Sequence, residues 1–384
     1  MNQIEPARRV LVFVNHFHPY AGGLETAVLE LYAKLRELHP NVCVDVVCNN
    51  TEKAPEEETV RGLDVHRMDC RTFLGGRYSA PKLRSLIRIL SKLKERQYDL
   101  INTHTRFFIN TVIGFCVAKW RGVPHVHTEH GASFTRVENW FVSMISVLFD
   151  QTLGRMVLSL ADTVVANSAA SARFAKRLGA RHPVVTPNGV DAASRVFDGD
   201  FSNKEASSLI FVGRLVFGKG VQDLLAALRD VHQPWKLRVV GDGPFRKDLE
   251  VLTKQYGLTE YVQFLGQLEK DGVHCQLARS QIFISPTFTE GFGMTVIEAG
   301  LEGCAVIASN VGGPAEIIDD GVDGCLIDGF EKRSPERVAR LRDKVVELLD
   351  NSVLARTFGE RLNRKVTEHY TLEMSTRAYW AFIA

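Results

Sequence analysis

The sequence lacks any long apolar run. Its longest candidates, residues 10–14 and 141–149, span five and nine residues, and the second contains two serines. A membrane-spanning helix needs about 20 apolar residues, and the apolar part of a signal peptide needs about 7–15 behind a basic start. We therefore expect neither a signal peptide nor a transmembrane helix, so that any membrane contact is peripheral.

Paired cysteines are also missing. The seven cysteines are an odd number, lie scattered along the chain, and include no Cys-x-x-Cys pair. We interpret them as reduced, mostly buried thiols of a cytoplasmic protein. They stand at Cys43, Cys48, Cys70, Cys116, Cys275, Cys304 and Cys325.

A strong net charge is absent as well. The 47 Lys and Arg nearly balance the 45 Asp and Glu, which gives no indication of nucleic-acid binding. Residues 61–96 are an exception, with ten Lys or Arg and three acids. Within them, residues 77–96 are a candidate contact with an anionic membrane surface, peripheral on its cytoplasmic face, and a solvated helix face is the alternative. One stripe of this helix is expected to face the core: Leu83, Leu86, Ile87, Leu90 and Leu93.

What the chain does have is a regular alternation of short apolar runs with longer helical patterns. Such runs are typical of strands buried on both faces of a parallel sheet, and the alternation indicates βαβ units. This predicts an α/β protein of two Rossmann-like, doubly wound parallel-sheet domains. The expected strands are residues 10–14, 42–48, 100–104, 124–128, 163–166 and 184–186, then 209–212, 237–240, 262–265, 282–285, 305–308 and 325–327.

A polar stretch separates the two halves. We predict an N-terminal domain over residues 1–190, a linker over 191–207, a C-terminal domain over 208–370, and a final helical segment over 371–384. The linker contains the triplet Asp198-Gly199-Asp200. Because this triplet does not follow a predicted strand, we interpret it as a solvated turn and not as a metal site.

The loop after the strand 209–212 has the composition of a phosphate site. It reads Gly-Arg-Leu-Val-Phe-Gly-Lys-Gly over residues 213–220 and places Arg214 and Lys219 at the start of a predicted helix. A P-loop would carry Ser or Thr as its magnesium ligand where Gly220 stands. Two cations at a helix N-terminus are able to neutralise a diphosphate without metal. A glycine-rich turn with solvated charges is the alternative.

A second loop follows the strand 282–285. Glu290 precedes a glycine-bounded turn, and Glu298 lies eight residues further on, within a helix expected to begin near Met294. Carboxylates at this spacing suit the vicinal hydroxyls of ribose or hexose. One helix-terminal charge and one surface acid is the alternative. Between the two acids lie Gly291, Phe292, Gly293, Met294 and Thr295.

Two loops of the first half are weaker candidates. Gly22 and Gly23 follow the strand 10–14, and paired glycines allow backbone amides to approach a ligand closely. They do not form Gly-x-Gly-x-x-Gly, so a nicotinamide cofactor is not indicated. His130 follows the strand 124–128 and precedes a glycine, whereas His104 and His127 are expected in the core or behind the site.

Together these motifs resemble the retaining glycosyltransferases of the GT-B fold, in the large group called glycosyltransferase family 4. The resemblance covers nearly the whole chain and is most specific at residues 213–220 and 290–298. Supporting matches are Gly22-Gly23, Glu129-His130-Gly131, Ala166-Asn167-Ser168, Pro187-Asn188-Gly189-Val190-Asp191, Gly241-Asp242-Gly243-Pro244 and Gly312-Gly313-Pro314-Ala315-Glu316.

The resemblance implies a reaction and a set of roles. The two domains would face a central cleft, the C-terminal one binding a nucleotide-diphosphate sugar, with the final helix crossing back to the N-terminal, acceptor-binding domain. Arg214 and Lys219 would hold the diphosphate, Glu298 the ribose, and Glu290 the hexose near the amides of Phe292 and Gly293. Gly241 would line the donor site, His130 would lie beside the sugar, and Gly22 and Gly23 would approach the phosphate. Transfer would retain the anomeric configuration and need no metal or other cofactor.

Other readings remain open at this point. A P-loop phosphotransferase would use Lys219, a nucleotide-sugar epimerase shares the architecture, and a non-catalytic nucleotide-sugar sensor would keep Arg214, Lys219 and Glu298. The expected role is hexose transfer from a UDP- or GDP-sugar to a glycan or lipid-linked acceptor in cell-surface polysaccharide or glycolipid synthesis. The sequence does not identify the base, the sugar, the acceptor or the oligomeric state.

Overall fold

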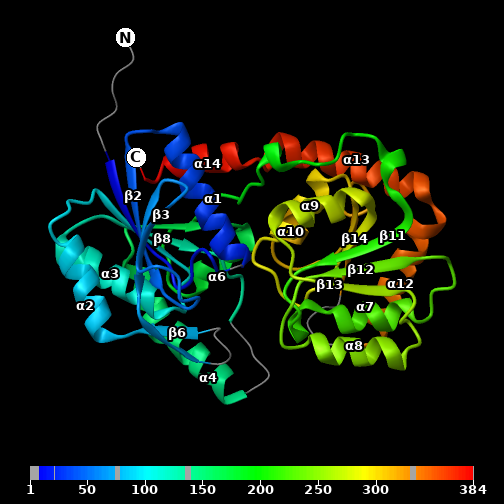
Figure 1. The fold of residues 1–384 in the computed structure, drawn as a ribbon, viewed down its shortest axis with the longest axis horizontal. Helices are drawn as coiled ribbons and strands as arrows, with labels where there is room; N and C mark the ends of the chain where they lie inside the picture. Colours follow the sequence, from blue (N-terminus) through cyan, green and yellow to red (C-terminus); the bar gives the residue numbers. More distant parts are fainter. Residues whose placement is uncertain (1–7, 21, 74–77, 135–139, 329–333, 384) are drawn as a thin grey trace, which may run out of the picture. The chain divides into compact units, whose positions relative to one another are not determined.

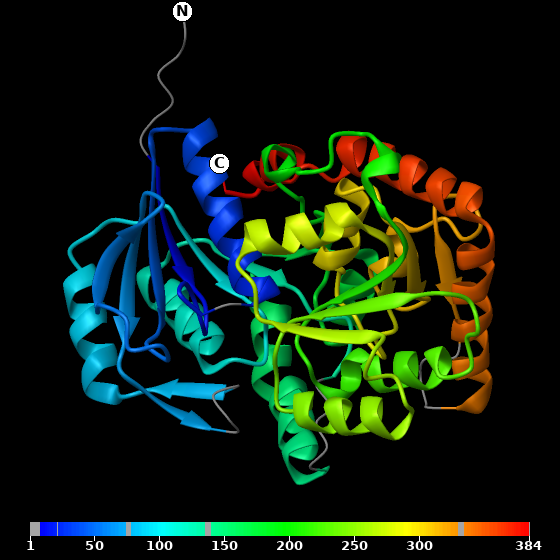
Figure 2. The same cartoon turned by 45° about the vertical axis from the view of Figure 1, so that its right-hand side comes forward.

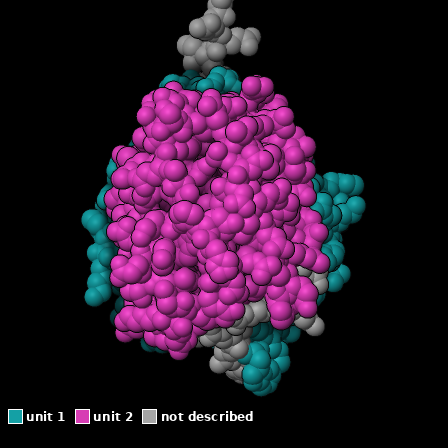
Figure 3. Space-filling view, turned by 90° about the vertical axis from the view of Figure 1, so that its right-hand side faces the viewer, with its two compact units in different colours: residues 1–188, 372–384 teal, residues 189–371 magenta. Residues whose placement is uncertain are grey.

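The computed structural model describes residues 8–20, 22–73, 78–134, 140–328 and 334–383. The chain forms two compact units, shown in separate colours in Figure 3. Unit 1 comprises residues 1–188 and 372–384, and unit 2 comprises residues 189–371. The chain therefore leaves the first unit once, completes the second, and returns with its last residues.

Unit 1 is built on an eight-stranded sheet with the order β10-β9-β8-β7-β1-β2-β4-β3 (Figure 1). Its strands pair in parallel except β3, which is antiparallel to β4. A separate hairpin joins β5 to β6. The bounds are β1 Arg8–Phe13, β2 Val42–Asn49, β3 Glu57–Val60, β4 Leu63–Met68, β5 Cys70–Phe73, β6 Tyr78–Pro81, β7 Leu100–His104, β8 His125–Glu129, β9 Thr163–Ala166 and β10 Val184–Val185.

The strands β3 and β4 were not predicted from the sequence. They are joined by Arg61 and Gly62, which both have positive φ, as a two-residue hairpin turn requires. Strand β3 is at the sheet edge and has no buried residue, and β4 buries the polar His66 and Arg67. Neither strand therefore presents the continuous apolar run by which the other strands were recognised.

Helices connect the parallel strands of unit 1 and cover its sheet (Figure 2). Between β8 and β9 the chain passes through α4, a single π-helical turn, and α5. Their bounds are α1 Gly23–Leu38, α2 Leu83–Leu93, α3 Ile109–Arg121, α4 Trp140–Phe149, the π-helical turn Asp150–Gly154, α5 Arg155–Leu160 and α6 Ala169–Arg177.

Unit 2 has a six-stranded, wholly parallel sheet with the order β13-β12-β11-β14-β15-β16. Counted from its own first strand, this is the order 3-2-1-4-5-6 of a doubly wound dinucleotide-binding sheet. The strands are β11 Glu205–Val212, β12 Lys236–Val240, β13 Val262–Gly266, β14 Ser280–Ser285, β15 Ala305–Ser309 and β16 Cys325–Ile327.

Helices cover both faces of this sheet. Leu209 and Phe211 of β11 pack into one apolar cluster, and Ile210 between them packs into the other, as the alternation of side chains along a strand requires. The first cluster contains α7, α8 and α12, and the second contains α9, α10 and α13. The bounds are α7 Val221–Leu228, α8 Arg246–Gln255, α9 Lys270–Arg279, α10 Met294–Leu301, α11 Pro314–Ile317, α12 Pro335–Asp350 and α13 Ser352–His369.

The stretch predicted as a polar linker is largely anchored to unit 2, which corrects that prediction. Residues 205–207 already belong to β11. The buried carboxylate of Glu302 accepts hydrogen bonds from the backbone amides of Val196 and Phe197 and from His274. Lys204 donates to four backbone carbonyls of the same unit. The predicted solvated turn at Asp198 and Asp200 is exposed.

The last helix, α14 (Leu372–Trp380), is part of unit 1. It packs against α1, where Tyr379 is buried in the core of the unit. The ring of Trp380 stacks on His39 with centroids 4.0 Å apart. In the part of the chain that the structure describes, no helix has the length and apolar character of a membrane span.

Candidate active site

The topological switch point of unit 2 lies between β11 and β14, which are neighbours in the sheet although β12 and β13 separate them in sequence. Ligands of open α/β sheets bind outside the carboxyl ends of the strands at this point. The two loops that follow these strands are residues 213–220 and 286–293. They contain half of the donor-site residues predicted from the sequence.

The two loops are held in contact through their backbones. Gly220 caps α7 with a φ of 75°, and a Cβ atom on it would collide with the carbonyl of Pro286. The Phe288 amide donates to the Gly218 carbonyl at 2.8 Å. The position at which a P-loop would have a hydroxyl residue is thus one that only glycine fits.

Lys219 and Glu290 meet across these loops. Their side chains form an ion pair with Nζ and Oε2 2.6 Å apart, and both are partly exposed. The other oxygen of Glu290 accepts from the Gly291 amide at 3.2 Å. Arg214 is exposed and forms no ion pair with any described residue. The loop thus presents one cation with no ion pair among the described residues and a second that is held by a carboxylate.

Glycines bring neighbouring loops against the same region. A Cβ atom on Gly241, after β12, would overlap the Gly213 carbonyl, so the loops after β11 and β12 touch backbone to backbone. A Cβ atom on Gly312, after β15, would likewise overlap the Glu290 carbonyl. Four consecutive loops of the carboxyl edge are therefore packed too closely for side chains at these positions.

The helix α10 begins at Met294, as predicted, and Gly293 caps it with a φ of 96°. Glu298 is half-buried in this helix, and Met294 and Thr295 in its first turn are also half-buried. Phe292 is buried in the core of unit 2, so only its backbone is available to a ligand. The Gly291 carbonyl accepts from the Gly313 amide at 3.1 Å.

A buried arginine that sequence reasoning missed lies behind these loops. Arg337 of α12 is fully buried, with its Nη2 3.1 Å from Asp223 in α7. The same nitrogen donates to the Pro286 carbonyl at 2.8 Å, and the guanidinium lies 4.0 Å from the ring centroid of Phe288. Arg337 therefore ties α12 to α7 and to the loop of residues 286–293. In sequence it is one of several cations on a helix, and nothing in the pattern distinguishes it.

In unit 1, His130 lies in a polar network at the carboxyl ends of β7, β8 and β9. Its Nε2 is 3.0 Å from Nδ1 of His104, and its Nδ1 is 3.4 Å from Nδ2 of Asn167. The Asn167 amide is oriented by Ser171, which donates to its oxygen at 2.9 Å. The amide nitrogen therefore points to His130.

This orientation fixes the tautomers. Nδ1 of His130 accepts from Asn167, so its Nε2 carries the proton and donates to His104. His104 is then protonated on Nε2, which has no partner among the described residues. Burial, opposed by the charge of Glu129, lowers the pKa of His130 to about 4. At neutral pH the imidazole is uncharged, and both of its nitrogens are engaged by protein side chains.

Beneath His130 lies a buried charge cluster that the sequence did not reveal. Arg106 is fully buried, with Nη1 2.9 Å from Glu129 and Nη2 3.1 Å from Asp150, both also fully buried. Burial opposes ionisation of Glu129, but Arg106 and neighbouring hydrogen bonds outweigh it, and the carboxyl pKa falls to about 2. Glu129 also accepts from the Gly131 amide at 2.7 Å, which fixes the backbone on both sides of His130.

The returning helix α14 completes this part of unit 1. The Tyr379 hydroxyl hydrogen-bonds Thr128 of β8, and the Tyr32 hydroxyl of α1 donates to Asn102 of β7 at 2.9 Å. A small hollow beside them is lined by His104, His130 and residues of α1 and α14. The C-terminal residues therefore contribute directly to the surroundings of His130.

The predicted glycine pair occupies the start of α1 in unit 1. Gly22 caps the helix with extended backbone, and a Cβ atom on it would collide with the carboxylate of Glu25. Around Gly23 the space is open, with no atom within 4 Å of an added Cβ. An acid in the first turn thus lies where the resemblance implies phosphate, which makes Gly23 the more accessible of the two.

Part of the positive charge of the basic segment is neutralised by acidic partners. Arg67 is buried against Glu58, and Arg88 and Lys92 pair with Glu56 and Glu57 of the β3 region. The prediction of a continuous core-facing stripe on α2 is also wrong in part. Ile89 and Leu93 are the buried residues, whereas Leu83 is 69% and Ile87 55% exposed.

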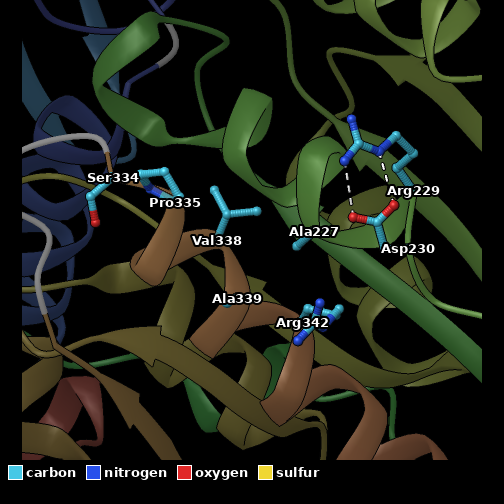
Figure 4. Close-up of a pocket in the computed structure, with 8 residues that line it drawn as sticks. All are labelled: Ala227, Arg229, Asp230, Ser334, Pro335, Val338, Ala339 and Arg342. Carbon is cyan, nitrogen blue, oxygen red and sulfur yellow. Dashed lines mark hydrogen bonds and ion pairs between the residues drawn. The ribbon is translucent and has the colours of Figure 1, made fainter.

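A hollow of unit 2 lies elsewhere, between α7 and α12 (Figure 4). It has a volume of about 500 Å³ and is lined by Ala227, Arg229, Asp230, Ser334, Pro335, Val338, Ala339 and Arg342. Arg229 pairs with the adjacent Asp230, with two contacts near 3 Å, and Figure 4 shows this pair at the rim. None of the predicted donor-site residues lines it.

Solved structures that are similar over the whole chain establish the fold class. The fold is similar to that of sucrose-phosphate synthase from Thermosynechococcus elongatus, with a TM-score of 0.83, 21% identity and coverage of 98% of each chain. It is also similar to Anabaena HepE, solved in complex with UDP-glucose, with a TM-score of 0.76, 20% identity, and coverage of 98% of this chain and 99% of the other. The protein has the GT-B fold.

Sequence comparison then gives the family. The model described as Glycosyltransferase Family 4 matches residues 21–194, and the model described as Glycosyl transferases group 1 matches residues 196–364. The chain belongs to this glycosyltransferase family. An uncharacterized glycosyltransferase of Methanocaldococcus jannaschii is 29% identical over 97% of each chain. The gpi3 subunit of phosphatidylinositol N-acetylglucosaminyltransferase from Schizosaccharomyces pombe is 23% identical over 94% of this chain and 78% of its own.

Proposed function

We propose that this protein is a retaining glycosyltransferase that needs no metal. It transfers a hexose-type sugar from a UDP- or GDP-sugar to a glycan or lipid-linked acceptor, in cell-surface polysaccharide or glycolipid synthesis on the cytoplasmic side of a membrane. One observation carries the proposal. Two loops at the switch point of the unit 2 sheet present Arg214, Lys219 and Glu290 around closely packed glycines.

The chemistry of these groups matches a nucleotide-diphosphate sugar. In transfer, the bond between the anomeric carbon and the diphosphate oxygen breaks, and a bond to the acceptor oxygen forms on the same face of the sugar. The departing phosphate oxygen takes the proton of the acceptor hydroxyl. Arg214, Lys219 and the amides at the start of α7 stabilise the charge that develops on the leaving group. The similarity to a structure that holds UDP-glucose supports this donor class.

The carboxylates are assigned to hydroxyl groups. Glu298, half-buried in α10, is proposed to accept from the ribose, and Glu290 from the hexose. Gly241 lines the donor site as a close backbone approach, and the backbones of Gly291, Phe292 and Gly293 face the sugar. On binding, the diphosphate competes with Glu290 for Lys219, which releases Glu290 toward the sugar hydroxyls.

His130 is proposed to orient the transferred sugar and not to act as a base. Its Nε2 proton is directed to His104, and its Nδ1 already accepts from Asn167. An inverting reaction would need a base in hydrogen-bond reach of the acceptor, on the face opposite the leaving group. A ring with both nitrogens engaged is poorly suited to that task. Gly22 and Gly23 are assigned to the approach of unit 1 toward the phosphate.

The test combines donor screening with product analysis. A thermal-shift screen of UDP- and GDP-sugars is expected to raise the unfolding temperature for the true donor, because a ligand of the native state stabilises it. Transfer with that donor is expected to survive EDTA, and NMR of the product is expected to show a retained anomeric configuration. Loss of transfer in EDTA with recovery in Mg²⁺ or Mn²⁺, or an inverted product, would contradict the mechanism.

The same product analysis separates two other activities. Without acceptor, an epimerase would change the sugar of the donor, and a non-catalytic binding protein would give neither transfer nor hydrolysis. We expect slow hydrolysis at most, with no epimerised sugar.

A further inference from the structure

We propose that α4 is a membrane-docking helix, whose exposed apolar side lies on an anionic lipid surface. The proposal concerns a partner of unit 1 and rests on the proposed function only in taking a lipid-linked acceptor as the reason for docking. It also moves the expected membrane contact from the basic segment at residues 77–96 to a different element.

The exposure of the side chains on α4 is the reverse of that on most surface helices, which bury apolar residues and expose polar ones. Met144 and Ile145 are each 49% exposed and Leu148 is 61% exposed, whereas Ser146 is only 9% exposed. Trp140 at the start of the helix is 74% exposed. These four residues lie at i, i+4, i+5 and i+8, on one side of the helix. A helix that buries one of its serines and exposes several large apolar residues is suited to an apolar surface and not to water.

The charge on and near the helix indicates that the apolar surface it contacts is that of an anionic membrane. From Trp140 to Phe149 the sequence contains no charged residue. Arg155, the residue directly after the π-helical turn that ends the helix, is exposed. It forms no ion pair with an acid among the described residues. An uncharged helix followed by an unpaired arginine matches the boundary between acyl chains and anionic headgroups.

The position of α4 in the fold supports the same partner. It lies in the connection that follows β8, the strand after which His130 also stands. The β5–β6 hairpin follows β4 at the same edge of the sheet, and its Phe73 is 51% exposed. Figures 1 and 2 both show α4 and this hairpin at the same end of unit 1. Docking through α4 would therefore hold the acceptor-binding edge of the sheet near the lipid.

A second protein copy is a less suitable occupant. A stable protein interface commonly buries about 800 Å² per partner from about 20–30 residues. Four apolar side chains on a ten-residue helix fall well short of this. They are sufficient for weak, reversible insertion into a lipid interface, where a neighbouring cation adds attraction.

The test measures binding to vesicles in the absence of donor. The full chain is mixed with vesicles of phosphatidylglycerol and phosphatidylcholine, or of phosphatidylcholine alone, and the bound fraction is measured by co-sedimentation. We expect clear binding to the anionic vesicles and little to the others. The triple variant Met144→Ser, Ile145→Ser, Leu148→Ser is expected to lower the partition coefficient by about tenfold or more.

Matched variants separate the helix from general surface effects. Val251→Ser with Val353→Ser removes exposed apolar residues of unit 2, which are 52% and 73% exposed, and is expected to leave binding unchanged. Arg155→Ala is expected to weaken binding to anionic vesicles only. Circular dichroism and the thermal shift given by the donor nucleotide, both without vesicles, check folding and donor binding independently.

The outcomes are distinct. Equal vesicle binding by the wild type and the triple variant would overturn the proposal, as would the absence of binding by the wild type. A wild-type dimer in light scattering that the triple variant dissociates would assign the helix to a second copy instead. Failure of the donor screen with intact vesicle binding would overturn the proposed function and leave the docking helix standing.

Discussion

The sheets of both units contain the parallel order 3-2-1-4-5-6, which unit 1 extends with β10 and the antiparallel β3, but the two units place their charged groups in opposite ways. In unit 1, the ionised groups nearest to His130 are buried and compensated: Arg106 lies between Glu129 and Asp150, all fully buried. Burial lowers the pKa of His104 and of His130, so these imidazoles are held neutral. In unit 2, the cations at the corresponding edge of the sheet stay at the surface, with Arg214 exposed and Lys219 partly so. The same architecture thus supports a nearly neutral site in one unit and a cationic one in the other.

This difference matches the charges of the two proposed substrates. A diphosphate brings two negative charges that need cations at its position, whereas the hydroxyls of a sugar or acceptor are bound by hydrogen bonds and need no counter-charge. Both units nevertheless contain one fully buried arginine behind the site, Arg106 in unit 1 and Arg337 in unit 2. In each case the guanidinium joins a loop of the carboxyl edge to a helix. The buried arginine is therefore a structural device, and the exposed one is available to a ligand.

The largest expected effect breaks the buried cluster of unit 1. Arg106→Leu leaves Glu129 and Asp150 buried without a counter-charge, and loss of one partner of a buried pair costs about 3–5 kcal/mol. We expect the free energy of unfolding of unit 1 to fall by this amount, as measured by native-state hydrogen exchange of β7 and β8. Arg337→Leu is expected to have the same effect on unit 2.

The control for this prediction is an exposed pair in the same unit. Lys119 and Asp162 are 3.3 Å apart and both about half exposed, so Lys119→Leu is expected to change stability by less than about 1 kcal/mol. An Arg106 variant as mild as the Lys119 variant would show that the cluster is not the anchor of the His130 loop.

The second prediction tests the surface cations of unit 2. Lys219→Ala and Arg214→Ala are each expected to weaken nucleoside-diphosphate binding by about 1.5–3 kcal/mol, the value of a charge-assisted contact, without loss of stability. Calorimetry with UDP and GDP measures this. Arg229→Ala, at the rim of the hollow between α7 and α12, is the matched control and is expected to leave the affinity for UDP and GDP unchanged. Unchanged affinity in both loop variants would remove the diphosphate assignment.

The third prediction concerns pH and sharpens the contrast between the units. Burial lowers the pKa of His125 to about 3 and that of His130 to about 4, and it also lowers that of His104, against about 6.5 in the unfolded chain. Between these values the unfolded chain binds more protons, so stability is complete above pH 6.5 and falls as the pH is lowered toward 4.

One buried imidazole contributes a slope of up to about 1.4 kcal/mol per pH unit in this range. Asp150 acts in the opposite sense, because burial raises its pKa and folding then favours its protonated form at low pH. We expect the hydrogen-exchange protection of unit 1, corrected for the intrinsic exchange rate at each pH, to fall from pH 6.5 to 4.5 more than that of unit 2, and His125→Gln to reduce the slope. Equal slopes in the two units would contradict the assignment.

The parallel strands were largely predictable, because burial on both faces leaves a continuous apolar run. Strands β7, β9 and β16 begin and end where the sequence predicts. Strand β4 was missed because it buries Arg67 and His66, and the core stripe of α2 was misassigned because a wide apolar arc does not reveal which side meets the sheet. The periodicity of a sequence shows that a helix has an apolar face, but it does not show which part of the protein that face packs against.

For the candidate site, the glycine-rich loops after the strands could be predicted from the sequence. The contacts that their side chains make could not. The pairing of Lys219 with Glu290 joins residues 71 positions apart, and Arg106 meets Glu129 and Asp150 at separations of 23 and 44. Each is an ordinary charged residue until the fold brings the partners together. The roles assigned to Arg214, Glu298 and His130 remain predictions.

The smallest expected effect is also the most specific, because its sign separates the two carboxylates of unit 2. Glu290 holds Lys219 in an ion pair, and a diphosphate would compete for that lysine. Glu290→Gln frees the cation, so free UDP or GDP is expected to bind equally or more tightly, by about 0–1 kcal/mol, the value of a partly exposed ion pair. Transfer is expected to fall, since the hexose loses a carboxylate partner.

Glu298→Gln is expected to weaken the binding of free nucleotide and of donor together, because Glu298 is assigned to the ribose that both contain. Calorimetry with the free nucleotide and with the donor, followed by single-turnover transfer, distinguishes the two. If Glu290→Gln weakened the free nucleotide as much as Glu298→Gln does, the ion pair would be part of the nucleotide site, and the division of the carboxylates between sugar and ribose would be wrong.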